Sequence, residues 1–160
     1  MKPIRVVSRC FFATLLVAAA ASAQSPDYRT ITDPAESAQP VALEILKHLA
    51  AGELERAAEL SNAPGRRLEV LHQFMSSVGK EEFRRLFARY FAPQNRVVLE
   101  AAIGAHRLLV WELGEANRQL AGQYYVELDG RFVMDDVPSA ERAQLQRVLE
   151  SQRQNFRSSR

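Results

Sequence analysis

Cysteine is almost absent from this chain of 160 residues, because Cys10 is the only one. A single cysteine excludes an internal disulfide and a zinc site made of several thiolates. The sequence also lacks paired histidines at metal-ligand spacing, a G-x-S-x-G turn around a serine and a glycine-rich phosphate loop. We therefore expect no metal, no cofactor and no nucleophile–base pair that a motif would reveal.

The chain has a single long apolar run, which lies close to its N-terminus. Three basic residues precede this run, and the small-x-small tripeptide Ala21-Ser22-Ala23 ends it. The run from Cys10 to Ala23 covers 14 residues, fewer than the roughly 20 that a membrane span needs. We therefore predict that residues 1–23 are a secretory signal peptide. The protein is then periplasmic or secreted, with no stable membrane anchor after cleavage.

The chain has no large excess of positive or negative charge once residues 1–23 are removed. Residues 1–23 contain three basic residues and no acidic one, so cleavage leaves 18 Lys and Arg against 19 Asp and Glu. The net charge changes from +2 to −1, and Cys10 is lost. Because no broad basic character remains, we expect no nucleic-acid partner.

Helical periodicity is present in the first half of the mature chain. The strongest amphipathic pattern places apolar residues at i, i+3, i+4, i+7 and i+8, at Phe83, Leu86, Phe87, Tyr90 and Phe91. The predicted helices cover residues 40–51, 53–61, 66–78 and 80–92. Before them, residues 24–39 are predicted to form a flexible lead-in, with a turn of helix after Asp33-Pro34.

The pattern changes to strands after residue 95. Runs of β-branched and aromatic residues, separated by glycines, predict strands over 96–103, 106–113, 119–128 and 131–137. Their short connections favour antiparallel neighbours. The expected fold class is α+β, with N-terminal helices packed on a curved antiparallel four-stranded meander, plus a C-terminal helix over 139–155. Residues 40–155 then form one domain, followed by a frayed tail over 156–160.

Alternation along the predicted strands sorts their side chains onto two faces. The apolar face is predicted to hold Leu109, Trp111, Leu113, Tyr124, Val126, Leu128, Phe132 and Met134. We expect Phe83, Leu86, Phe87 and Phe91 of the fourth helix to pack against it. The other face is mixed, so we expect it to be partly solvated or covered by a partner, and a homodimer through it is one hypothesis.

Two segments carry a resemblance to a known superfamily. They are AAGELERAAEL at 50–60 and GRFVMDDV at 130–137. Together with the order of helices and strands over 40–137, they resemble the nuclear transport factor and ketosteroid isomerase superfamily. The resemblance implies a cone-shaped α+β fold, in which a curved sheet wraps a long helix and leaves a pocket at its open end. The chain departs from it in having no predicted strand among the helices and in adding a C-terminal helix.

The resemblance leaves several functions open, because this superfamily includes isomerases, hydratases, dehydratases, binding modules and immunity proteins. Our leading hypothesis is a non-catalytic binding or interaction module with an apolar, sheet-lined pocket. Its partner would be a small apolar ligand or another protein. The alternatives are a cofactor-independent isomerase, hydratase or hydrolase that uses the cavity, and a periplasmic toxin-immunity protein.

The candidate site residues follow from these hypotheses. The predicted ligand-binding residues are Trp111, Tyr124, Phe132 and Met134 on the apolar face. If the protein is an enzyme, the candidate catalytic residues are Asp136, Tyr124 and His106. Asp135 and Asp136 are adjacent on a strand, so their side chains point to opposite faces and cannot form a two-carboxylate dyad there. The structural interpretation of these two acids is that they cap the following helix or bond the turn at Pro138.

The signal-peptide prediction can be checked by intact-mass analysis of the exported protein. We expect cleavage after Ala23, so that the mature chain begins at Gln24, with or without cyclisation of that residue. An exported species that still carries Arg5 and Arg9 would contradict the prediction.

Overall fold

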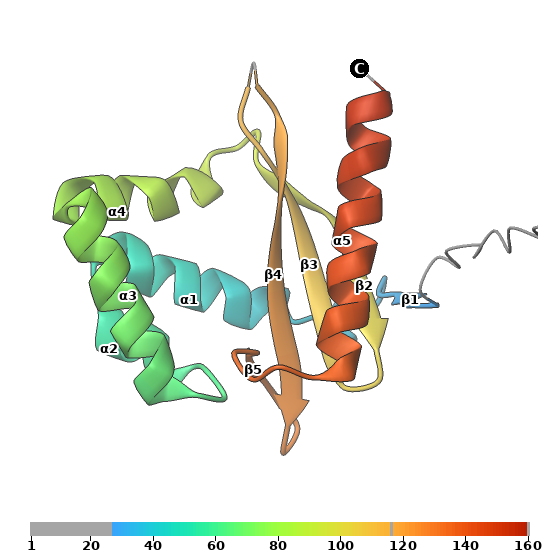
Figure 1. The fold of residues 1–160 in the computed structure, drawn as a ribbon, viewed down its shortest axis with the longest axis horizontal. Helices are drawn as coiled ribbons and strands as arrows, with labels where there is room; N and C mark the ends of the chain where they lie inside the picture. The colour runs from blue at the N-terminus through green and yellow to red at the C-terminus, as the bar shows by residue number, and fades with distance from the viewer. Residues whose placement is uncertain (1–26, 116, 160) are drawn as a thin grey trace, which may run out of the picture.

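The computed structural model describes residues 27–115 and 117–159, and the predicted signal peptide lies outside these residues. The described chain is an α+β fold in three layers. Four helices, α1 to α4, lie on one side of an antiparallel sheet and pack on one another, and the long helix α5 lies along the other face (Figure 1). The predicted fold class is thus confirmed in its main features.

The helices of the first layer follow the predicted order. Their bounds are α1, Gln39–Ala51; α2, Leu54–Glu59; α3, Pro64–Val78; and α4, Lys80–Ala88, which continues into the 3-10 turn η2, Arg89–Phe91. Gly52 ends α1 in the left-handed region at φ 79°, where its N–H reaches the carbonyls of His48 and Leu49. A glycine adopts this conformation without steric cost, so the chain can reverse between α1 and α2.

Within the described residues the sheet has five strands, one more than predicted. They are β1, Arg29–Thr30; β2, Arg96–Ile103; β3, His106–Leu113; β4, Gln119–Leu128; and β5, Arg131–Met134. Each strand pairs antiparallel with the next one along the chain, in the order β1-β2-β3-β4-β5. The last strand ends at Met134 rather than at residue 137, because the two aspartates that follow bond to other parts of the fold.

The extra strand comes from the segment that we expected to be a flexible lead-in, and for residues 27–38 this expectation is wrong. β1 pairs with Ala101 and Ala102 of β2, and the buried Ile31 continues the contact with an N–H bond to the Glu100 carbonyl. The predicted helical turn after Asp33 is present as η1, Pro34–Glu36, with the Asp33 side chain capping it. A two-residue strand is too short to be recognised from alternation.

The inner core lies between the first helical layer and the sheet. Leu109, Trp111 and Leu113 of β3 face it as predicted, together with Met134 of β5. From β4, however, the core residue is the fully buried Tyr125, and our assignment of Tyr124, Val126 and Leu128 to this face is wrong by one position. The pairing of Tyr125 with Met134 fixes this register, and a slip of one residue exchanges the two faces of a strand.

The outer face of the sheet is covered by α5, Ala140–Ser158. Its buried residues Leu145, Val148 and Leu149 pack on Leu108 and Val110 of β3. This chain's own helix therefore covers the face that we expected solvent or a partner to reach. The helix also runs through residues 156–158, which we expected to be frayed. No helix in the described part of the chain is both long enough and apolar enough to cross a membrane.

Gly122 of β4 sets how closely α5 approaches the sheet. A Cβ atom built on Gly122 would lie 2.4 Å from Cδ2 of Leu149 and 3.2 Å from Cδ1 of Leu108. Since real contacts of this kind essentially never fall below 3.0 Å, a side chain at this position would force the Leu149 side chain or α5 to shift. The absence of a side chain thus permits close packing between the sheet and α5.

The apolar side of α4 packs inward only in part. Phe83 is completely buried and lies 4.8 Å from Phe87, measured between ring centroids. Tyr90 stands edge-on to Trp111 at 5.3 Å. Phe91, which we expected to pack on the sheet, is 48% exposed because the helix tightens into η2 before Pro93. The sequence pattern identified the correct helix, but two of its predicted contacts are wrong. Leu86 is only partly buried and lies outside the inner core, and Phe91 is exposed.

These positions provide a matched test of core packing. We expect Phe83→Ala to lower the free energy of unfolding by about 3–5 kcal/mol, the usual cost of truncating a buried phenylalanine. Phe91→Ala removes the same atoms from an exposed position and should cost less than about 1 kcal/mol. Urea denaturation measures both values, and similar costs for the two variants would show that α4 packs differently.

Candidate functional site

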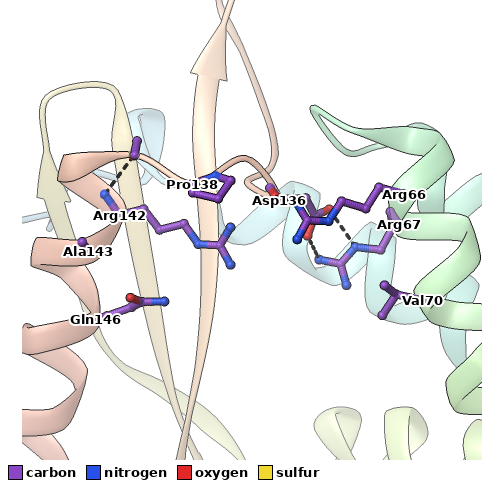
Figure 2. Close-up of a pocket in the computed structure, with 9 residues that line it drawn as sticks. Arg66, Arg67, Val70, Asp136, Pro138, Arg142, Ala143 and Gln146 are labelled. Carbon is purple, nitrogen blue, oxygen red and sulfur yellow. Dashed lines mark hydrogen bonds and ion pairs between the residues drawn. The ribbon is translucent and has the colours of Figure 1, made fainter.

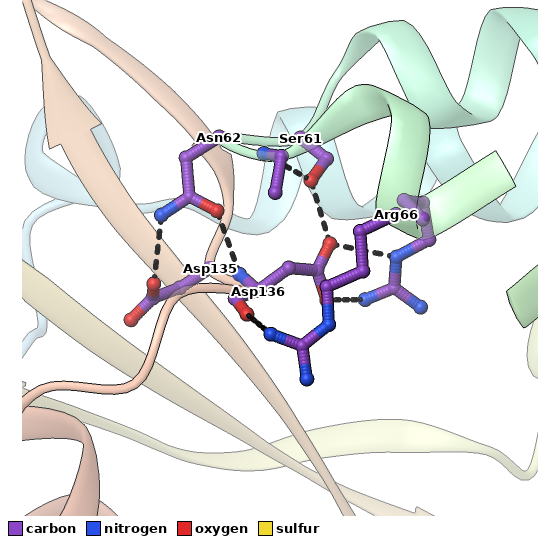
Figure 3. A network of polar contacts seen from close by, with 7 residues as sticks. Ser61, Asn62, Arg66, Asp135 and Asp136 are labelled. Carbon is purple, nitrogen blue, oxygen red and sulfur yellow. Dashed lines mark hydrogen bonds and ion pairs between the residues drawn. The ribbon is translucent and has the colours of Figure 1, made fainter. Parts of the chain in front are cut away.

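The candidate site begins where β5 meets the turn between α2 and α3. The N–H of Met134 donates to the Leu60 carbonyl at 2.7 Å, and the N–H of Asn62 donates to the Met134 carbonyl at 3.0 Å. Ser61 and Met134 thereby form a parallel bridge. This pairing places the acids after β5 directly against the start of α3 (Figure 3).

Asp136 is held by donors from that turn and from α3. Its carboxylate accepts hydrogen bonds from the Ser61 hydroxyl at 2.6 Å and from Nε and Nη2 of Arg67, with the Nε bond at 2.8 Å. Its own N–H donates to the Asn62 side chain at 2.7 Å. Both carboxylate oxygens are thus occupied, and the ion pair with Arg67 joins the first helical layer to the end of the sheet.

Asp135 points the other way, as expected for adjacent residues at a strand end, and is only 2% exposed. One carboxylate oxygen accepts from the Asn62 amide at 2.9 Å, and the other lies 2.9 Å from Nδ1 of His106. An ionised carboxylate only accepts hydrogen bonds, so Nδ1 is the donor of this pair when Asp135 is ionised. Nε2 of His106 faces outward, 4.0 Å from the carboxylate of Glu141.

The two aspartates therefore have structural partners different from those that we expected. Neither caps α5, because the Ser139 side chain does so by accepting from the N–H of Arg142 at 3.0 Å. Asp135 instead links β5 to β3, and Asp136 links it to α3. The hydroxyl of Ser61 donates to Asp136 and not to His106. Among the described residues, no serine therefore pairs with His106 as a nucleophile would pair with its base.

Tyr124 lies on the α5 side of the sheet rather than in the inner core. The guanidinium carbon of Arg142 stands 5.3 Å from the centre of its ring, a cation–π arrangement. Burial raises the pKa of the Tyr124 hydroxyl above its usual value, and the nearby Arg153 and Arg142 only partly offset this effect. The phenol therefore stays protonated at neutral pH.

A cavity of about 170 Å³, here called the edge cavity, lies beside β4. β5 pairs only with Tyr125–Leu128, so the earlier part of β4 has no fifth strand beside it, and the cavity is found there. Its apolar walls come from all four helices of the first layer and from β5, through Ile45, Leu49, Ala57, Leu71, Phe87 and Met134. Gln123, Asp135, Arg67 and Arg142 provide polar groups.

The structure brings only some of the predicted ligand-binding residues together. Tyr124 and Met134 line the edge cavity. Trp111 is 2% exposed and is packed into the inner core, with its indole N–H donating to Gln123 at 2.9 Å. Phe132 lies further along β5, under the guanidinium group of Arg107.

A second pocket, of about 300 Å³, adjoins the edge cavity, since Arg67 and Arg142 line both (Figure 2). We call it the arginine pocket; its other lining residues include Arg66, Val70, Asp136, Pro138 and Ala143. Sequence reasoning did not identify Arg66, Arg67 or Arg142. The adjacent acids at 135–136 signalled that donors were needed, but nothing in one sequence indicates which arginine supplies them.

A larger groove lies at the opposite edge of the sheet. It has a volume of about 620 Å³ and is lined mainly by residues 30–43 and 97–100. Its buried acid, Glu100, already accepts from the Ser37 hydroxyl and the Ala38 N–H. Since charged side chains from separate elements converge at the arginine pocket instead, we place the candidate site there and in the edge cavity.

Metal binding has no support within residues 27–115 and 117–159, where no group of three or more His, Cys, Asp or Glu side chains is suitably placed. Comparisons of the chain with protein-family models, with curated proteins and with solved structures found no match. A functional proposal therefore depends on the chemistry of the site itself.

The role of Asp136 can be tested by a change that removes one charge. We expect Asp136→Asn to lower the free energy of unfolding by about 1–3 kcal/mol, since Arg67 loses a charge-assisted hydrogen bond in a largely buried position. Asp129→Asn, at the exposed β4–β5 turn, should change it by less than about 0.5 kcal/mol. Equal effects in thermal or urea unfolding would contradict a structural ion pair.

Proposed function

We propose that this protein is an exported, non-catalytic binding module that holds a small apolar ligand in the edge cavity. The observation that carries this proposal is the composition of the cavity wall. Side chains from α1, α2, α3, α4 and β5 converge on one space, and most of them are aliphatic or aromatic. Binding pockets are commonly concave, largely apolar and furnished with a few polar groups.

The size of the cavity indicates the kind of ligand. An apolar cavity of about 150 Å³ in another protein admits a molecule such as benzene. The edge cavity has a similar volume, about 170 Å³, and differs in that its wall also contains Arg67, Gln123, Asp135 and Arg142. By volume it suits one aromatic ring or a short aliphatic group. A bulkier molecule would have to extend into the adjoining arginine pocket.

The partners of the candidate catalytic residues favour binding over turnover. Asp136 has both carboxylate oxygens engaged by Arg67 and Ser61. His106 is paired with the buried Asp135, and the ring of Tyr124 lies under the guanidinium group of Arg142. Each group therefore has a stabilising role in the fold that does not require a reaction.

Two further parts of the proposal rest on the sequence. Export depends on the signal peptide predicted over residues 1–23. A relationship to the nuclear transport factor and ketosteroid isomerase superfamily is supported by the order of helices before a meander and by a cavity between these layers. In that setting the edge cavity would correspond to the pocket expected at the open end of a cone-shaped fold.

Methionine methyl groups offer a direct test of binding. The sequence has three methionines, and Met134 lines the edge cavity, whereas Met75 packs on the inner core outside it. In the protein labelled with ¹³C at the methionine methyl groups, toluene should shift the Met134 signal in a saturable manner. The Met75 signal should hardly move, which makes it an internal control.

A pair of substitutions in α3 provides the second control. Leu71→Phe adds bulk to the cavity wall and should weaken toluene binding strongly. Leu68→Phe makes the same change at a position that packs on the inner core without lining the cavity, and should leave binding nearly intact. Unsaturable or absent Met134 shifts in the native protein would refute the proposal.

A further inference from the structure

The arginine pocket contains more positive than negative charge. Its lining includes three guanidinium groups, from Arg66, Arg67 and Arg142, and one carboxylate, from Asp136. Figure 2 shows that Arg66 and Arg67 reach into this space from α3, while Arg142 reaches in from α5 on the opposite side. Only Arg67 forms an ion pair with the carboxylate. Two positive charges therefore converge without a compensating anion in the lining.

Arg142 is the more informative of these two residues. Its Nε–H is buried and has no hydrogen-bond partner in the described structure, and no carboxylate there forms an ion pair with it. Its guanidinium group instead stands over the Tyr124 ring. Buried donors without partners are rare in folded proteins. A donor gives up its hydrogen bonds to water when it is buried, and leaving it without a new acceptor costs free energy. An acceptor supplied by a ligand would satisfy it.

Arg66 is similarly available for a ligand. Its one hydrogen bond in the described residues is long, 3.5 Å from Nη1 to the backbone carbonyl of Asp136. The neighbouring Arg67 differs, because the ion pair with Asp136 fixes it. The pocket thus combines one arginine held in an ion pair with two arginines that form no ion pair with a carboxylate of the lining.

We propose that the arginine pocket binds the carboxylate of a small organic acid, whose apolar body occupies the edge cavity. This inference rests on the proposed function and specifies its ligand class. The two spaces meet at Arg67 and Arg142, which line both. A molecule with a charged head and an apolar body would therefore place each part in a matching environment.

A carboxylate fits this pocket better than an inorganic ion does. The planar guanidinium fork matches the two oxygens of a carboxylate, which it can bind through parallel hydrogen bonds. Val70, Pro138 and Ala143 contribute apolar surface to the wall, and an inorganic ion would leave this surface in contact with water. Asp136 adds a fixed negative charge that opposes a doubly charged phosphate more than a singly charged carboxylate.

Benzoate and toluene separate the two parts of this ligand, because they share a ring and differ in the carboxylate. Binding is followed in the purified protein through the Met134 methyl signal. We expect benzoate to bind more tightly than toluene, and its affinity to fall as ionic strength rises. Arg66→Gln and Arg142→Gln should each weaken benzoate binding by about tenfold or more. Arg66 does not line the edge cavity, so its variant should change toluene binding less than about twofold, and Arg142→Gln should weaken benzoate binding more than toluene binding.

Two further variants control for charge and for structure. Arg147→Gln makes the same change at an exposed position of α5 outside the pocket, and should not affect either probe. Arg142→Lys keeps the positive charge without the planar fork, so it should recover part of the benzoate affinity lost in Arg142→Gln. Because Arg66 makes no stacking contact, its variant remains informative even if the loss of Arg142 disturbs Tyr124.

The outcomes distinguish this inference from the proposed function. An equal loss of benzoate and toluene binding in the arginine variants, or native benzoate binding no tighter than that of toluene, overturns the carboxylate site. Tighter binding of inorganic phosphate than of benzoate also overturns it. This result would appear as displacement of benzoate by phosphate at a concentration below the one at which benzoate itself binds. If toluene does not bind but benzoate does, the edge cavity is not an apolar binding site in its own right. Benzoate binding that depends on Arg66 and Arg142 would still support the anion site.

Discussion

The burial of β3 on both of its faces is the constraint on which the rest of this structure depends. Every residue from Arg107 to Leu113 is buried, so neither face of the sheet can be left to solvent. The four helices before the sheet cover one side, and α5 covers the other. The first helical layer and α5 lie on either side of β4, and β5 is too short to pair with the whole of β4. The edge cavity lies at this unpaired part of β4, and the arginine pocket adjoins it.

Most of the elements were predictable from the sequence because their signals are local. Helical periodicity, glycines in turns and the Asp129-Gly130 hairpin depend on residues close together in the chain. The faces of β4 were not predictable, since Tyr124 and Tyr125 are both aromatic and alternation fits either register. Pairing with β5 decides between them. β1 escaped prediction because two residues contain no pattern, and only its contact with β2 makes it a strand.

The candidate site was far less predictable, because its contacts join distant parts of the chain. Asp136 was identified as a candidate, yet its partner Arg67 is 69 positions away. Arg142 reaches the same region from the C-terminal helix, to which the sequence analysis assigned no contact. An aspartate pair in a sequence indicates that donors must be nearby. The fold alone determines which donors these are, and it also leaves two arginines in the pocket without a carboxylate.

In the described chain, α5 follows every strand of the sheet that it covers. The outer face of β3, at Leu108 and Val110, is covered by Leu145, Val148 and Leu149 of this helix. A chain that terminates before residue 140 would keep every strand and expose an apolar surface, and such surfaces promote aggregation. Premature termination would then yield an aggregation-prone fragment rather than a smaller folded domain.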